Sequence, residues 1–101
     1  MLAFVLAGNP AAARAADEAA GRAKARACTT CHGPLGISRG PNTPNLAGQP
    51  GTYLVEQLKA YRSGRRASEV MGIVAKPLTD ADILDLAAWY ASIEIGAKTK
   101  P

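Results

Sequence analysis

The five residues Cys28-Thr29-Thr30-Cys31-His32 constrain this chain more than any other feature, because they contain both of its cysteines and its only histidine. Cys-x-x-Cys-His is the attachment pattern for a c-type haem. Two thiols that add across the two vinyl groups of one porphyrin must lie about one helical turn apart. The imidazole of the next residue can then reach the iron. The motif therefore predicts one covalent haem, attached through Cys28 and Cys31, with His32 as the proximal ligand.

Three other interpretations of a Cys-x-x-Cys pair compete with this one. A thioredoxin-like redox dithiol needs a βαβ context, and no strand pattern lies nearby. A zinc site needs four ligands, and the sequence has no further Cys or His. A structural disulfide in a secreted domain is the third possibility. The histidine that follows the pair and the features further along the chain favour haem.

Length and composition are consistent with a small domain built around a cofactor. The chain has 101 residues, which predicts a single domain. Its hydrophobic content is 48%, but much of this is alanine and only 5% of the residues are aromatic. A buried porphyrin would supply the large apolar centre that these side chains do not. The formal net charge of +4 would fall by about two with both haem propionates ionised. No nucleic-acid-binding motif is present, so nucleic acid is not an expected partner.

The N-terminal residues have the character of an export signal. A short apolar run from Leu2 to Ala7 is followed by an alanine-rich stretch with Ala13-Arg14-Ala15, a cleavage site of the A-x-A type. The run is too short to span a bilayer, so no transmembrane segment is expected. We expect residues 1–16 to be an export-signal remnant or a disordered tail, and residues 17–101 to form the domain. Export would place the protein in the periplasm.

Helical spacing and capping residues predict three main helices. The first should run from Asp17 to Cys28, with acids at its start and bases near its end, as the helix dipole favours. The second should span Thr52 to Arg62. The third should begin at Thr79-Asp80-Ala81-Asp82, a capping box with Asp in place of Glu, and end near Gly96.

Two long loops should connect these helices. Residues 33–51 contain five Gly and four Pro, so this segment must be held by contacts other than regular hydrogen bonding. Residues 65–77 read as a second loop with about one helical turn. The expected fold class is therefore all-α, with three main helices and long loops.

The chain resembles the class I c-type cytochromes, and within them the short bacterial cytochromes c and the single halves of di-haem cytochromes c. The resemblance covers residues 17–95. It rests on segments that occur in the family's order, namely Cys28-Thr29-Thr30-Cys31-His32-Gly33, Thr43-Pro44-Asn45-Leu46-Ala47-Gly48-Gln49, Tyr53-Leu54 through Gly64, Met71 with Ile73, Pro77-Leu78-Thr79-Asp80-Ala81-Asp82-Ile83 and Trp89-Tyr90. It implies the cytochrome c fold wrapped around one covalent haem c.

The resemblance also implies roles for residues around the iron. The second imidazole nitrogen of a ligating histidine needs an acceptor, and the family pattern assigns the carbonyl of Pro44, with Pro34 as the alternative. Met71 matches the family's sixth ligand and is the only methionine outside the N-terminal tail. A lone methionine is otherwise a common gap-filler in a core. Lys76 is close enough in sequence to replace Met71 at high pH.

Further positions follow from the same resemblance. The expected apolar wall of the haem crevice consists of Leu46, Leu54, Leu58, Ile73 and Leu86, which would equally serve as ordinary core. Gly21 is either the point where the first helix crosses the last one near Trp89 or Tyr90, or a neutral surface position.

The resemblance and the ligands that it implies predict an electron carrier. Residues 22–66 contain eight bases and one acid, whereas residues 69–94 contain five acids and one base. These charges are either scattered and solvated, or they form a polarised surface that would orient the protein on redox partners, a donor dehydrogenase or cytochrome complex and an acceptor oxidase or reductase. With both axial positions filled, no enzymatic activity is expected, and the protein should be a monomer or weak dimer. The alternatives are a haem subunit permanently docked to a dehydrogenase and an open-site haem enzyme or gas sensor.

Overall fold

The structure, a computed structural model, describes residues 16–100. Five helices of the α type and one 3₁₀ segment make up its regular elements, and the described residues contain no strand. The all-α expectation is therefore confirmed. The expected N-terminal tail lies almost entirely outside the described residues.

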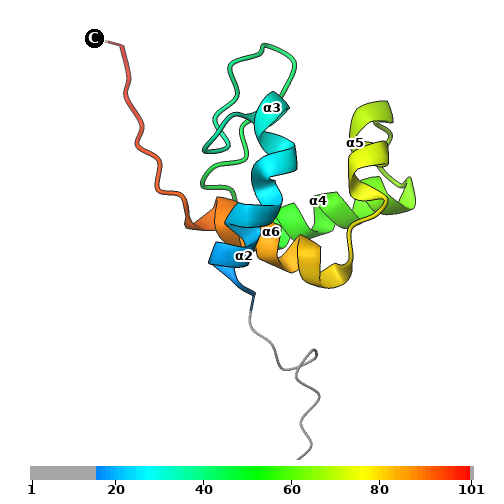
Figure 1. The fold of residues 1–101 in the computed structure, drawn as a ribbon. Helices are drawn as coiled ribbons and strands as arrows, with labels where there is room; N and C mark the ends of the chain where they lie inside the picture. The colour runs from blue at the N-terminus through cyan, green and yellow to red at the C-terminus, as the bar shows by residue number, and fades with distance from the viewer. Residues whose placement is uncertain (1–15, 101) are drawn as a thin grey trace, which may run out of the picture.

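The first helical column contains three elements in succession and runs to His32, where the sequence predicts one helix that ends at Cys28. α2 spans Glu18–Lys24 and begins at Asp17, whose side chain accepts a hydrogen bond from the Ala20 amide. The backbone then tightens into the 3₁₀ segment η1, Ala25–Cys28, before the short helix α3, Thr29–His32. The two cysteines are thus carried by the last turns of a single column (Figure 1).

The remaining helices are α4, Gly51–Ser63, α5, Glu69–Ala75, and α6, Asp80–Ser92. α4 ends where Gly64 adopts a left-handed conformation with φ of 84°, which glycine reaches without a steric penalty. α5 is two turns long, so the helical content of the second loop exceeds the one turn expected. α6 has the predicted capping box, but it ends at Ser92 and the chain is extended from Ile93, so the expected end at Gly96 is wrong.

The core lies where α2 and α4 pack against α6. Gly21 is buried at the crossing of α2 and α6, and a Cβ atom there would lie 1.9 Å from the carbonyl oxygen of Asp85. The close approach of the two helices therefore depends on glycine at this position. The central cluster consists of Ala25, Leu54, Leu86, Ala87 and Tyr90.

α3 and α5 rise on the same side of the base formed by α4 and α6, and they face each other across it (Figure 1). This arrangement brings the elements that carry His32 and Met71 to opposite sides of one space. The loop of residues 33–50 stands beside α3 and completes that end of the molecule.

Candidate haem site

The two cysteines of the motif differ in their surroundings. Cys28 is half-buried and packs against the central cluster, whereas Cys31 is exposed. Both thiols are free, so the disulfide interpretation has no support here. Within residues 16–100 no cluster of three His, Cys, Asp or Glu side chains could hold a metal ion, so a zinc site has no support either.

His32 is buried and held in a defined orientation. Its side chain lies at the end of α3, is only 7% exposed, and its Nδ1 atom lies 2.8 Å from the carbonyl oxygen of Pro44. A carbonyl oxygen can only accept a hydrogen bond, so Nδ1 carries the proton in this contact. In the neutral ring with its proton on Nδ1, the other nitrogen, Nε2, keeps its lone pair, and this is the form of imidazole that binds a metal.

The loop that supplies Pro44 is fixed by its own hydrogen bonds. The amide of Ser38 donates to the Asn45 side chain at 2.7 Å, and the amide of Leu46 donates to the Gly36 carbonyl at 2.7 Å. These bonds follow Pro44 in the chain and help to hold its carbonyl at Nδ1 of His32. The histidine contact goes to Pro44, and no such bond is made by Pro34.

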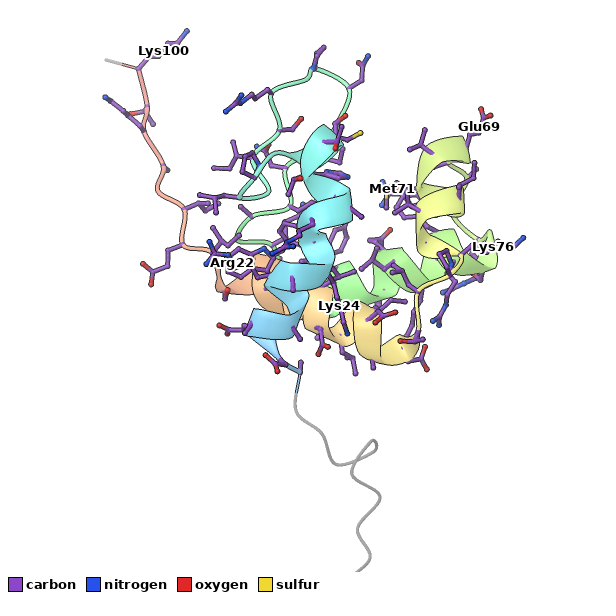
Figure 2. The ribbon with its side chains drawn as sticks, in the orientation of Figure 1. Arg22, Lys24, Glu69, Met71, Lys76 and Lys100 are labelled. Atoms are coloured by element: carbon purple, nitrogen blue, oxygen red, sulfur yellow. The ribbon has the colours of Figure 1, made fainter. Side chains whose placement is uncertain are left out.

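Met71 lies in the first turn of α5, on the side of that helix that faces α3 (Figure 2). Its backbone amide donates to the hydroxyl of Ser68, which caps the helix, at 3.2 Å. The Met71 side chain is half-buried, but the neighbouring Val70 and Ile73 are 62% and 70% exposed. Met71 therefore faces the space between α5 and α3, whereas Val70 and Ile73 are largely exposed to solvent.

The expected apolar wall is distributed over several elements. Leu54 and Leu86 are in the central cluster, Leu46 and Leu58 are partly buried against it, and Ile73 is exposed. In the described residues the protein thus has a thin core whose central cluster includes two alanines. A large flat apolar group between α3 and α5 would be in reach of side chains that are otherwise left to solvent.

A buried tyrosine adjoins the motif, a position that the sequence did not predict for it. Tyr90 is 3% exposed, and its hydroxyl has no nitrogen or oxygen partner in the described residues. It lies beside Cys28, and burial raises the pKa values of both the Cys28 thiol and the Tyr90 hydroxyl. Both groups are therefore neutral at pH 7. A neutral, desolvated Cys28 is a weak nucleophile, which argues against a role for the pair as a reactive redox dithiol.

These features fit a covalently bound haem. Two free thiols one turn apart, an imidazole with a free Nε2 and a methionine on the facing helix are the donors that such a group requires. Cys28 and Cys31 would hold the porphyrin, and His32 would hold the iron. The fold and the donors together define the class of c-type cytochromes.

Comparisons with known proteins agree with this class. The Cytochrome c family profile matches residues 16–94. The chain is 51% identical over 83 residues to cytochrome c4 of Thiocapsa roseopersicina, a match that covers 81% of this chain and 43% of that protein. It is 46% identical over 83 residues to cytochrome c-554(548) of Halomonas halodenitrificans, covering 79% of this chain and 100% of that protein. The chain belongs to the cytochrome c family, and its cofactor is haem c.

Further relatives bear on the fold and on the length of the match. The solved structure of reduced cytochrome c4 from Pseudomonas stutzeri superposes with a TM-score of 0.75 at 37% identity, covering 79% of this chain and 47% of that one. A thiosulfate dehydrogenase electron acceptor of Thiomonas intermedia is 37% identical over 87 residues, covering 85% of this chain and 40% of that protein. The chain thus has the cytochrome c fold and spans less than half the length of several relatives that it matches.

Charges that are separated along the sequence are paired in space. Lys24 lies 2.9 Å from Asp82 and 2.7 Å from Asp85, and Arg62 lies 2.7 Å from Asp80. Two bases of the basic stretch therefore neutralise three acids of the acidic stretch, and the surface is less polarised than the sequence suggests. No local pattern could reveal these pairs, because 18 residues separate Arg62 from Asp80 and 61 separate Lys24 from Asp85.

Proposed function

We propose that this chain is a one-electron carrier in which His32 and Met71 are the two axial ligands of the haem iron. The observation that carries the proposal is the orientation of His32 by Pro44, with Met71 on the helix that faces it. When bound, the haem supplies an iron that exchanges one electron between its ferrous and ferric states. No bond to a substrate is made or broken.

The protein's own residues set the properties of that centre. Pro44 fixes the tautomer and ring plane of His32, and it strengthens the Nε2 atom as a donor. The Met71 thioether is a neutral, soft donor, which favours ferrous iron and raises the reduction potential. With both positions filled, water, oxygen and peroxide have no open site. Leu46 and its apolar neighbours exclude solvent from the crevice.

We further propose that the carrier works outside the cytoplasm with redox protein partners. The export-type N-terminus supports this location, and none of the helices in the described region is long and apolar enough to cross a membrane. The relative from Thiomonas intermedia is itself described as an electron acceptor of a dehydrogenase. N-terminal sequencing of the native protein tests export, which an intact Met1 on the purified holoprotein would contradict.

A permanently docked haem subunit or domain is the second candidate. It is favoured by the similarity to the thiosulfate dehydrogenase electron acceptor of Thiomonas intermedia. The full-length match to cytochrome c-554(548) favours an independent carrier. Sedimentation of the native holoprotein separates the two, because a stable complex that survives high salt supports the docked form.

The visible spectrum of the purified protein in both oxidation states tests the axial ligands. Ferric iron with a thioether ligand shows a weak sulfur-to-iron band at the red end of the spectrum. Met71→Ala should remove that band, lower the potential and open the ferrous iron to carbon monoxide, whereas Met71→His should stay six-coordinate at a lower potential. Val70→Ala, at the exposed neighbouring position, is the matched control. An unchanged spectrum and potential in Met71→Ala would move the open-site enzyme or sensor ahead.

A further inference from the structure

Arg62 ties the last turn of α4 to the start of α6. One terminal nitrogen of its guanidinium donates to the backbone carbonyl of Leu78 at 3.0 Å, and the other lies 2.7 Å from the carboxylate of Asp80. The Arg62 side chain is 28% exposed, whereas that of Asp80 is 71% exposed. The hydrogen bond to the Leu78 carbonyl is therefore partly buried, whereas the ion pair with Asp80 is open to water.

The two Arg62 bonds hold the C-terminal end of the segment that carries Met71, residues 64–78, against α4. The chain leaves α4 at Ser63, forms α5, and returns to α4 where Arg62 holds Leu78. α5 packs mainly on α4 and makes no comparable contact with α6. Within the segment, the Leu78 amide also donates to the Ala75 carbonyl at 3.0 Å. The C-terminal end of α5 is thus connected to Arg62 through one short turn.

The N-terminal end of α5 is held by a helix cap and, just before it, by Arg66, whose bonds to Ala60 and Gln57 connect the segment to α4. Ser68 caps the helix through the amide of Met71 itself, and the residues that precede Ser68 are exposed. A seven-residue helix contributes little stability of its own. Its position therefore depends on contacts outside the helix, and the Arg62 bond to Leu78 is a charge-assisted one.

We propose that Arg62 is a positioning residue for Met71, which holds the segment of residues 64–78 closed so that the methionine sulfur stays at the iron. This inference rests on the proposed role of Met71 as the sixth ligand. Loss of the Arg62 bonds raises the population in which the segment swings away from α3 and leaves the sixth position vacant. The central cluster between α2, α4 and α6 is made of other residues and holds these helices together besides those bonds.

Binding of added imidazole to the ferric holoprotein measures this population directly. Imidazole can bind the iron only when Met71 has left, so its apparent affinity scales with the fraction of molecules in the open form. A charge-assisted hydrogen bond is stronger than a neutral one, and exposure to water reduces its contribution. Loss of such a bond should therefore tighten imidazole binding on the order of tenfold. Global destabilisation alone would not change this affinity.

Arg62→Met is the principal variant, because it keeps the apolar stem and removes every donor. Arg62→Lys, which retains the charge on a single donor head, should recover part of the native behaviour. Asp80→Ala should change the affinity by less than about threefold, since an exposed ion pair contributes little. Asp80→Lys should tighten binding further, because it repels the guanidinium from its place.

Two controls separate positioning from charge and from general stability. Arg26→Met removes an equal charge at an exposed position of the first helical column, outside the segment of residues 64–78. Lys24→Met weakens the contact between α2 and α6, remote from α5. Both controls should bind imidazole as the native protein does, although Lys24→Met should unfold at a lower temperature.

The outcomes distinguish this inference from the proposed function. Native imidazole affinity in both Arg62→Met and Asp80→Lys would overturn the positioning role of Arg62. If Arg62→Met gives no folded holoprotein, Asp80→Lys decides alone, and a native affinity there overturns the inference. Met71→Ala should bind imidazole most tightly of all. If Met71→Ala binds it no more tightly than the native protein, the sixth-ligand assignment itself fails.

Discussion

The Lys24 ammonium lies 2.7 Å from the Asp85 carboxylate, which is only 1% exposed, and joins the end of α2 to the middle of α6. Asp85 also accepts a hydrogen bond from the backbone amide of Asp17 at 2.9 Å. A carboxylate that has lost its hydration so fully needs such partners. The pair therefore fixes the helix crossing on which α3 and the haem motif are carried.

Removal of the ammonium should cost substantial stability. Loss of one partner of a buried ion pair costs about 3–5 kcal/mol, but Lys24 is one-third exposed and Asp85 keeps its amide donor. We therefore expect Lys24→Met to lower the free energy of unfolding by about 1–3 kcal/mol. Denaturant unfolding of the holoprotein measures this, with the exposed Arg26→Met as control. Equal values for the two variants would show that the pair contributes nothing.

Stability should fall in acid partly because of Asp82. Its backbone bond from Thr79 and its bond from Lys24 hold the pKa of this carboxyl below its usual range. A folded pKa below the unfolded value of about 3.9 gives stability that is present above that value and lost as pH falls through the folded pKa. Unfolding measured from pH 7 to pH 2 should therefore show a shallower acid limb in Asp82→Asn. An unchanged limb would assign the acid sensitivity to other carboxyls, of which Asp80 beside Arg62 is one.

The ion pairs of Lys24 with Asp82 and Asp85 should also make stability depend on pH in the alkaline range. The hydrogen bonds from Lys24 to Asp85 and Asp82 raise the pKa of the ammonium. A raised folded pKa gives stability that is complete below the unfolded value of about 10.4 and lost as pH rises through the folded pKa. Between these acid and alkaline limits, the network contributes a constant amount to stability.

Some of this architecture could be predicted from the sequence and some could not. The start of α6 follows from Thr79 and Asp82, which bond each other's backbone amides within one turn. Its end could not be predicted from Gly96, because the chain beyond Ser92 is extended and Ile95 lies over Gly48, from a distant part of the sequence. Local signals settle where helices begin, and tertiary contacts decide where this one ends.

Some features of the candidate haem site could likewise be predicted from the sequence, and others could not. Spacing alone placed the cysteines and His32 in one motif, and Ser68 followed by Glu69 was a capping signal that could have predicted α5. The Arg62 bond to Leu78 had no such signal, because a backbone carbonyl leaves no trace in the sequence. The roles of Pro44, Leu46 and Met71 toward the haem stay predictions until the holoprotein is measured.

Gly21 should tolerate no side chain. A Cβ atom would lie 1.9 Å from the Asp85 carbonyl oxygen and 2.9 Å from the Trp89 Cβ atom, so α2 and α6 must move apart. We expect Gly21→Ala to destabilise the holoprotein by about 2–4 kcal/mol, in the range of severe core overpacking. Gly51→Ala is the control, because its Cβ atom would meet only the Ala91 Cβ atom at 3.7 Å. Thermal unfolding that gives equal midpoints for both variants would contradict the close-approach role.

Electron transfer with a partner should slow as salt rises. Lys24 and Arg62 are paired with acids, but the exposed bases include two pairs that lie on different elements, Arg22 with Arg26 on the first helical column and Arg65 with Arg66 beyond α4. Exposed charges are screened beyond about 8 Å at physiological ionic strength, so transient docking by such charges weakens with salt. Stopped-flow rates from low to high salt measure the effect.

Two double variants locate the charge that matters for docking. Arg22→Gln with Arg26→Gln and Arg65→Gln with Arg66→Gln remove the same charge from different faces. We expect the pair nearer the docking face to lower the low-salt rate more and to flatten its salt dependence, because local charges orient the encounter. Equal losses in both would mean that net charge alone attracts the partner. A rate independent of salt, with a partner that co-purifies, would favour the docked subunit over the free carrier.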